Sequence, residues 1–339
     1  MNPPSAVNPT SASFVTDRVG WVLGVSSCGS GTCAVVMTTT DGGATWKRVA
    51  SPASSLADLT GSLGSPRIRF ANQKDGWIIG SHLWATHDGG ATWKQVGLPA
   101  PEADSQPTDI LVTGTVAWVL ALGGGADLLR SPVSSDEWSD VPQTASTAST
   151  GHLAGSESAV WEWLTGTAPD GSVASRLFAS DDAGATWTER PMPCPAPGGI
   201  AVGDGVGVVV CGGGSAAGSQ EKQAYLTHDN GQSFDLLTNP PFQGSLWGVG
   251  LRDASTLFVA AVSGATFLYG SSDAGATWST VFQGAGGGAQ VDDLAFASRT
   301  RGAFVLGYTA DISGGQPSVL MLSDDGGASW QAVTVEGGS

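Results

Sequence analysis

The sequence predicts an all-β fold, a β-propeller ring of seven four-stranded antiparallel blades, and three observations lead to this prediction. An eight-residue motif recurs along the chain, its spacing is close to the length of a propeller blade, and the composition suits short strands and tight turns. We expect a single domain over residues 1–339 with a flexible N-terminus at residues 1–10, because a ring of repeats folds as one unit.

The motif has the form Ser/Thr-x-Asp-x-Gly-x-Thr-Trp and is clearest from Thr86 to Trp93. Its Asp can accept backbone N–H groups across a turn, its Gly supplies a positive φ, and its Trp supplies a large apolar side chain. We therefore assign a structural role to the Asp and the aromatic residue of six full copies: Asp41 and Trp46, Asp88 and Trp93, Asp182 and Trp187, Asp229 and Phe234, Asp273 and Trp278, Asp325 and Trp330.

A seventh, degenerate copy is expected at Ser134–Trp138, with its Asp at Asp136. The gaps between successive Asp residues are then 47, 48, 46, 47, 44 and 52. This period predicts seven blades with the motif in the turn between strands C and D, and it makes blade 3 the degenerate one. Runs such as Phe70–Gly80 predict the inner strands A and B of each blade.

Composition and charge exclude several classes of protein. Gly accounts for 50 of 339 residues, and charged residues make up only 13%. The net charge of −16 disfavours binding to nucleic acid, which needs clustered Lys and Arg. No apolar run reaches the length of a transmembrane helix, so we expect no membrane span, and we expect a monomer.

The four cysteines indicate two disulfides, Cys28–Cys33 and Cys194–Cys211. No His or Cys lies near them at zinc-site spacing, so we expect no metal and no cofactor. Disulfides favour an extracytoplasmic location, whether secreted, periplasmic or cell-surface, with a signal or anchor removed before Met1. The alternative is a cytosolic protein with two pairs of buried free thiols.

The long loops are expected on one face of the ring, because strands of a blade alternate in direction and so place the D–A and B–C loops on the rim opposite the Asp turns. They are predicted at Ser51–Pro66, Gly97–Asp109, Ser139–Gly155, Gly212–Lys222 and Thr309–Pro317.

Arg67 and Arg69 begin strand A of blade 2 near this face, where a guanidinium pair could bind an acidic group of a partner. The alternative is a structural pair neutralised by Asp58 or by carboxylates of the inner strands.

The motif resembles the Asp-box, or bacterial neuraminidase repeat, and the resemblance covers the whole chain. Within the Asp-box propellers the pattern is most like the photosystem II assembly and stability factor-like family, and more distantly like sialidases and xyloglucanases. In these families the box marks a turn and not a catalytic group. A sialidase is disfavoured because Arg67-Ile68-Arg69 lacks the expected Pro and only Tyr225, Tyr269 and Tyr308 are present.

The expected function is therefore an exported, non-catalytic propeller that binds a protein or carbohydrate partner at the long-loop face. We assign no catalytic residues, since no nucleophile elbow, HExxH or phosphate-binding loop occurs. The alternative is a glycoside hydrolase with two carboxylates at the channel mouth.

Overall fold

A computed structural model gives the structure of the protein. It describes residues 6–28, 31–52, 59, 66–99, 105–123, 125–141, 148–168, 170–195, 197–203, 205–284, 288–307 and 317–336.

Seven four-stranded antiparallel sheets make up the described part of the chain, so the predicted fold class is confirmed. The strands are, in blade 1, β1 (Asn8–Phe14), β2 (Gly20–Cys28), β3 (Gly31–Thr39) and β4 (Lys47–Val49); in blade 2, β5 (Arg67–Phe70), β6 (Gly76–Ile79), β7 (Leu83–Thr86) and β8 (Lys94–Val96); in blade 3, β9 (Gln106–Thr113), β10 (Val116–Leu122), β11 (Ala126–Pro132) and β12 (Ser139–Asp140); in blade 4, β13 (Thr150–Gly155), β14 (Val160–Thr167), β15 (Val173–Ser180) and β16 (Thr188–Arg190); in blade 5, β17 (Pro197–Val202), β18 (Gly207–Ala216), β19 (Ser219–Thr227) and β20 (Asp235–Leu236); in blade 6, β21 (Ser245–Asp253), β22 (Thr256–Val262), β23 (Thr266–Ser271) and β24 (Ser279–Gly284); and in blade 7, β25 (Gln290–Phe296), β26 (Gly302–Gly307), β27 (Val319–Ser323) and β28 (Gln331–Val333).

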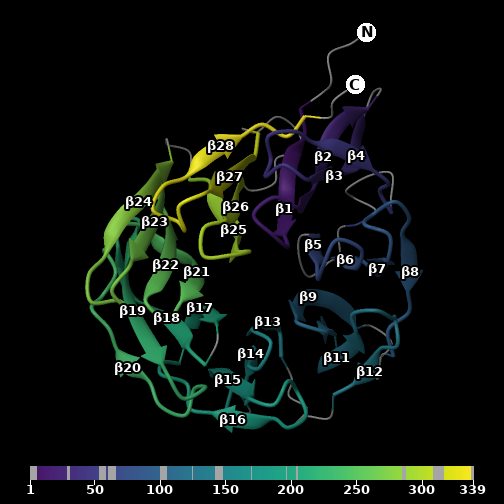
Figure 1. Ribbon diagram of the computed structural model, residues 1–339. Helices are drawn as coiled ribbons and strands as arrows, with labels where there is room; N and C mark the ends of the chain where they lie inside the picture. Colours follow the sequence, from purple (N-terminus) through teal and green to yellow (C-terminus); the bar gives the residue numbers. More distant parts are fainter. Residues whose placement is uncertain are drawn as a thin grey trace.

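The blades stand around a central axis, with the first strand of each blade innermost and the fourth strand outermost (Figure 1). In β-propellers the innermost strands line a central channel along this axis. Each sheet uses four strands that are consecutive in the chain, so blades 1 and 7 exchange none of the strands that the structure describes.

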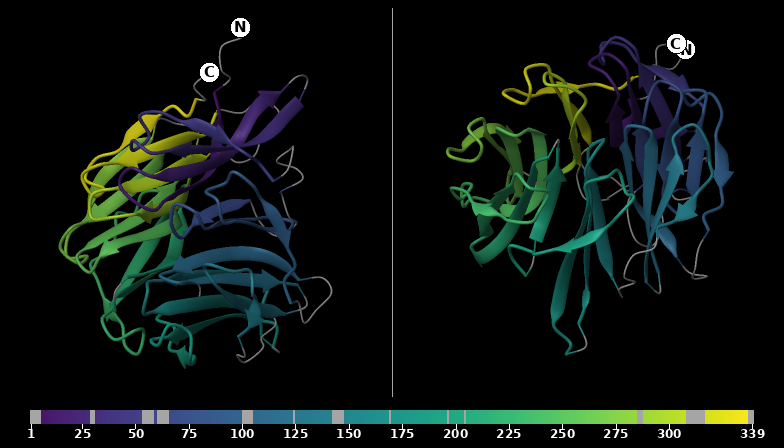
Figure 2. Two further views of the ribbon diagram at one scale, coloured as in Figure 1. Left: turned by 45° about the vertical axis from the view of Figure 1, so that its right-hand side comes forward. Right: turned by 60° about the horizontal axis from the view of Figure 1, so that its bottom comes forward.

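Blades 1 and 7 close the ring through side-by-side packing, which both views of Figure 2 show. Val7 N donates to Val335 O at 2.9 Å, and a shared apolar cluster joins Val22 and Val35 of blade 1 to Val305 of blade 7. Because β1 begins at Asn8, residues 8–10 of the predicted flexible terminus belong to a strand.

The Asp-box turns form the predicted hydrogen bonds. In blade 2, Thr86 Oγ1 and Thr92 N both donate to Asp88 Oδ1 at 2.8 Å, while Gly90 N donates to Thr86 Oγ1 at 2.9 Å. The other five full boxes repeat this pattern around Asp41, Asp182, Asp229, Asp273 and Asp325. Hydrogen bonds from the side chain and backbone of Thr45 lower the pKa of Asp41 to about 2.

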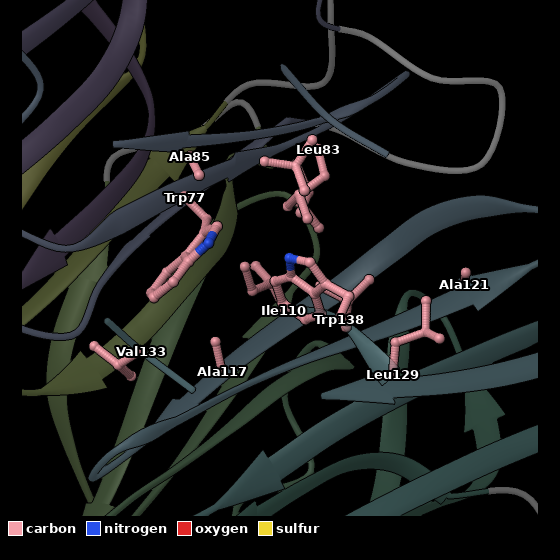
Figure 3. Packing of buried hydrophobic residues seen from close by; sticks show 12 residues of the cluster. Trp77, Leu83, Ala85, Ile110, Ala117, Ala121, Leu129, Val133 and Trp138 are labelled. Carbon is pink, nitrogen blue, oxygen red and sulfur yellow. The ribbon is translucent and has the colours of Figure 1, made fainter. Parts of the chain in front are cut away.

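The boxes also join neighbouring blades. Trp93 Nε1 donates across to Ala50 O of blade 1, and Trp21 Nε1 of blade 1 donates to Gly89 O inside the blade 2 box, both at 3.0 Å. The box aromatics themselves are mostly half-buried, whereas the tryptophans of the second strands, Trp21, Trp77, Trp118 and Trp161, are at most 2% exposed. These second-strand tryptophans therefore fill the interior between blades, as Figure 3 shows for Trp77 against blade 3.

The turn of blade 3 differs from the prediction. Strand pairing aligns Ser131 with Thr86 and Trp138 with Trp93, so the Asp position of this turn is Val133 and not Asp136. Val133 instead packs in the apolar cluster with Trp77 (Figure 3). The N–H of Trp77, which would face this turn by analogy with Trp21, has no hydrogen-bond partner among the described residues.

Three of the predicted long loops are shorter than expected. Within 97–109, β9 takes up residues 106–109. Within 139–155, β12 and β13 take up residues 139–140 and 150–155. Within 212–222, β18 and β19 continue as a ribbon that turns at Ala217 and Gly218, both with positive φ as a tight hairpin turn requires. Most of the remaining predicted loop residues, with Asp58 and Tyr308, lie outside the described residues.

Both predicted disulfides are present. Cys28 and Cys33 join the ends of β2 and β3, and Cys194 joins Cys211 within β18, with Cα–Cα distances of 5.8 and 6.3 Å. Cys211 lies inside the sheet, where it pairs with Pro197.

Candidate functional site

Arg67 and Arg69 lie on β5, the inner strand of blade 2, where residues alternate between half-exposed and buried. Ile68 and Phe70 point into the blade, so the two guanidinium groups face the channel, as the sequence predicts. Their side chains are 33% and 23% exposed.

Arg67 forms an ion pair with Asp109 of the neighbouring inner strand β9. Its Nη1 lies 2.6 Å from Asp109 Oδ1, and the buried carboxylate also accepts the amides of Ile110 and Leu153, each at 2.9 Å. Burial alone would raise the pKa of Asp109, but the charge of Arg67, together with His152 and the Leu153 amide, outweighs burial and lowers it. Asp109 therefore ties together the inner strands of blades 2, 3 and 4 as a carboxylate.

Arg69 forms a second ion pair, with Asp293 on the far side of the ring closure. Its Nη2 lies 2.6 Å from Asp293 Oδ1, while Oδ2 accepts the Ser11 hydroxyl and the Ala12 amide. Asp293 reaches this position from a bulge in β25, where its φ is 56°. The pair thus links blade 7 to blades 1 and 2.

These contacts agree with the alternative that carboxylates of the inner strands neutralise the two arginines. Ligand binding by Arg67 and Arg69 stays a prediction, and it now concerns only the part of each guanidinium group that remains accessible in the channel. Asp58, the other proposed partner, lies outside the described residues.

Strand pairing places four titratable residues at one level of the channel. In each of these blades, one residue of strand B pairs with the Ser or Thr that begins the C–D turn. The residue three positions further along strand B pairs with Arg67 in blade 2, Asp109 in blade 3, His152 in blade 4 and Asp292 in blade 7. His152 Nδ1 is 3.6 Å from Asp109 Oδ2. This level forms a polar layer near the start of the inner strands, on the long-loop side.

Asp292 and Trp247 are the members of this region that sequence reasoning missed. Burial and the negative charge of Asp293 raise the pKa of Asp292 to about 6, and the nearby indole N–H of Trp247 and the charge of Arg67 offset only part of that rise. The consecutive acidic residues Asp292 and Asp293 could have indicated a charged site. The repeat pattern of blade 7 becomes recognisable only at Phe296, so it did not assign the two residues to an inner strand.

A pocket of about 670 Å³ lies on the opposite rim, between blades 2 and 3. The turn of blade 3 lines it through Val133, Ser134 and Glu137, together with Asn72 and Asp75 of blade 2. The pocket is found where the Asp-box is missing, and it lies away from the long-loop mouth.

No group of His, Cys, Asp and Glu in the described ranges could hold a metal ion. None of the described segments forms a helix with the length and apolar character needed to cross a membrane.

The fold and its turns define the class of the protein as a seven-bladed Asp-box β-propeller. Residues 4–116, which span blades 1 and 2 and the first strand of blade 3, match the family model described as Photosynthesis system II assembly factor YCF48. The resemblance predicted from the motif is thereby confirmed. No curated protein matches the sequence significantly.

Solved structures show the same fold at low sequence identity. A structure of YCF48 bound to D1 peptide is 20% identical, with coverage of 90% of this chain and 91% of that chain and a TM-score of 0.60. YCF48 from Cyanidioschyzon merolae is 16% identical, with coverage of 90% and 93% and a TM-score of 0.55. The β-propeller domain of a trilobed protease from Pyrococcus furiosus is 8% identical, with coverage of 98% and 100% and a TM-score of 0.58.

Proposed function

We propose that this protein is an exported, non-catalytic propeller that binds a protein partner at the long-loop mouth of its channel, in the manner of an assembly or stability factor. The match of residues 4–116 to the YCF48 model supports this proposal, as does the likeness to a YCF48 that is bound to a peptide. The two disulfides support export.

The observation that carries the proposal is a fixed set of charged groups facing the channel, namely the polar layer and Arg69, two residues further along β5. The side chains of Arg67 and Arg69 are held in place by buried carboxylates, yet both remain partly accessible. Polar groups that are already ordered lose little entropy when a partner binds. The layer therefore suits recognition of a chain segment at the channel mouth.

Site-specific photo-crosslinking tests the binding face. A photoreactive residue at Gln290, the first residue of β25 at the mouth, is expected to capture the partner in the cells that produce the protein. The control position is Ala254, an exposed residue in an A–B turn on the Asp-box rim. Capture from Ala254 and not from Gln290 would place the binding face on the Asp-box rim and would refute the proposed face.

Variants that keep the charge balanced test the arginines. Arg67→Gln combined with Asp109→Asn removes the ion pair without leaving a buried charge alone. The double variant is expected to fold normally. If the accessible part of Arg67 contacts the partner, this variant loses crosslinking at Gln290.

A glycoside hydrolase is the second candidate, and Asp292 is the observation that favours it. A carboxyl group with a pKa of about 6 beside an exposed tryptophan could act as a general acid, while Asp109 stays ionised. Hydrolysis of a polysaccharide by the wild type that falls by orders of magnitude in Asp292→Asn would establish this activity. Equal activity in both proteins would rule it out for this site.

A further inference from the structure

Trp247 is unusual because it is a large aromatic residue on an inner strand and is 42% exposed. The pairing of β21 with β22 shifts between Leu246 and Gly248, so Trp247 occupies a bulge at the long-loop end of the strand. A bulge turns a side chain out of the regular alternation. The indole ring is therefore displayed at the channel mouth instead of packing within its blade.

The start of this strand is firmly held. The ammonium group of Lys222, whose side chain is fully buried, donates to the backbone oxygens of Pro241, Phe242 and Gln243 at 2.9–3.1 Å. Leu246 N donates to Gln220 Oε1 at 3.0 Å, directly before Trp247. The backbone that carries the exposed ring is thus fixed in advance of any binding event.

Asp292 lies on the neighbouring inner strand β25 at the same level as Gly248, and Val291 O is 3.9 Å from the position of a Cβ on Gly248, so the carboxyl group of Asp292 stands near Trp247. The arginines of the channel are paired elsewhere, Arg67 with Asp109 and Arg69 with Asp293. Every Lys and Arg of the chain falls in the part that the structure describes, and in that part none lies within 4.0 Å of Asp292. Among the described residues of these inner strands, the three carboxylates of Asp109, Asp292 and Asp293 thus stand against two guanidinium groups, and Arg67 acts on Asp292 only at longer range.

Space is also available beside the ring. Gly248 follows Trp247 at the level of the polar layer, and a methyl group added there would meet nothing closer than 3.9 Å. An incoming side chain could enter this space without moving the backbone.

We infer that Trp247 and Asp292 form a recognition pocket for a cationic side chain, and that the partner inserts a lysine or arginine at the channel mouth. A cation placed against the indole face is attracted by the ring quadrupole, and the adjacent carboxylate adds a charge-assisted hydrogen bond. The excess negative charge of the mouth selects this chemistry over an acidic one. The inference rests on the proposed function and names the group that the partner presents.

The test is an NMR titration that follows the indole N–H resonance of Trp247, identified by its disappearance in Trp247→Phe. The probes are blocked tripeptides, acetyl-Gly-X-Gly-amide, with arginine, lysine, norleucine or glutamate at X. The arginine and lysine peptides are expected to give saturable shifts, and comparison of the two shows which cation the pocket prefers. Norleucine matches the length of lysine without its charge and is expected to leave the resonance in place, as is glutamate.

Variants locate the binding energy. Asp292→Asn is expected to weaken the arginine peptide by about tenfold or more, because the charge-assisted bond is lost. Gly248→Leu is expected to block binding by filling the space while leaving both recognition groups intact. The matched control is Asp235→Asn, which removes an exposed carboxylate on the outer strand β20; its affinity should equal that of the wild type.

Equal binding of norleucine and lysine, or unchanged affinity in Asp292→Asn, would overturn the inference. The proposed function fails separately: a partner captured at Gln290 together with no cation binding leaves the function standing and refutes the pocket. Cation binding together with capture only from Ala254 refutes the site of the proposed function.

Discussion

Gly184→Ala is expected to destabilise the ring by forcing a blade 4 turn against the core of blade 3. Gly184 occupies the Gly position of its Asp-box with φ of 82°, and an added Cβ would overlap the ring of Trp118, which is fully buried. A residue with a Cβ in the left-handed region costs about 1–2 kcal/mol. Overpacking against a buried ring adds about 1–3 kcal/mol. The expected loss in the free energy of unfolding is therefore about 2–5 kcal/mol.

Gly171→Ala is the matched control, because it isolates the steric part of this loss. Gly171 has nearly the same φ, 83°, but an added Cβ there would meet nothing within 4 Å. Equilibrium unfolding in urea, followed by near-ultraviolet circular dichroism, measures both variants against the wild type. If both substitutions lower the free energy of unfolding equally, the contact between Gly184 and Trp118 does not contribute to stability, and the account of packing between blades is wrong.

Three further predictions concern charge and disulfides. Asp109→Asn should lower the free energy of unfolding by about 1–3 kcal/mol, because Arg67 and the amides of Ile110 and Leu153 lose the carboxylate that they bind. Adding Arg67→Gln should recover part of that loss in urea unfolding. If it recovers none, Arg67 and Asp109 are not a coupled pair. The pKa of Asp292 is about 6 in the folded protein against 3.8 normally, so protonated Asp292 contributes its full stability below pH 4 and this contribution is lost as the pH rises to 6. Asp292→Asn should therefore gain stability relative to the wild type across that range. A difference in the free energy of unfolding between the two proteins that stays constant with pH would contradict the raised pKa. Replacing Cys194 and Cys211 with Ser should lower stability by about 3 kcal/mol for a loop of this size, whereas an unchanged urea midpoint would show that the bridge does not form in the native protein.

The sequence by itself determined the blades and their turns. Each Asp-box hydrogen bond joins residues two to four positions apart, as between Thr86, Asp88 and Thr92, so the residue types that make the turn stand together in the chain. The disulfides were also predictable, because both pairs bridge neighbouring segments of one blade. The degenerate turn was only partly predictable: its Trp138 fits the repeat, but strand pairing was needed to show that Val133 stands at the Asp position.

Only the tertiary structure decided what surrounds the channel. Arg67 meets a carboxylate 42 residues away because blades 2 and 3 pack side by side, and Arg69 meets one 224 residues away because the ring closes. The bulges at Trp247 and Asp293 shift each side chain out of the regular alternation, so a periodic reading of the inner strands places them wrongly. Local hydrogen bonds join residues that are close in the chain, so a sequence pattern can predict them. Contacts across the channel depend on how the seven blades come together, and residue order alone does not specify that arrangement.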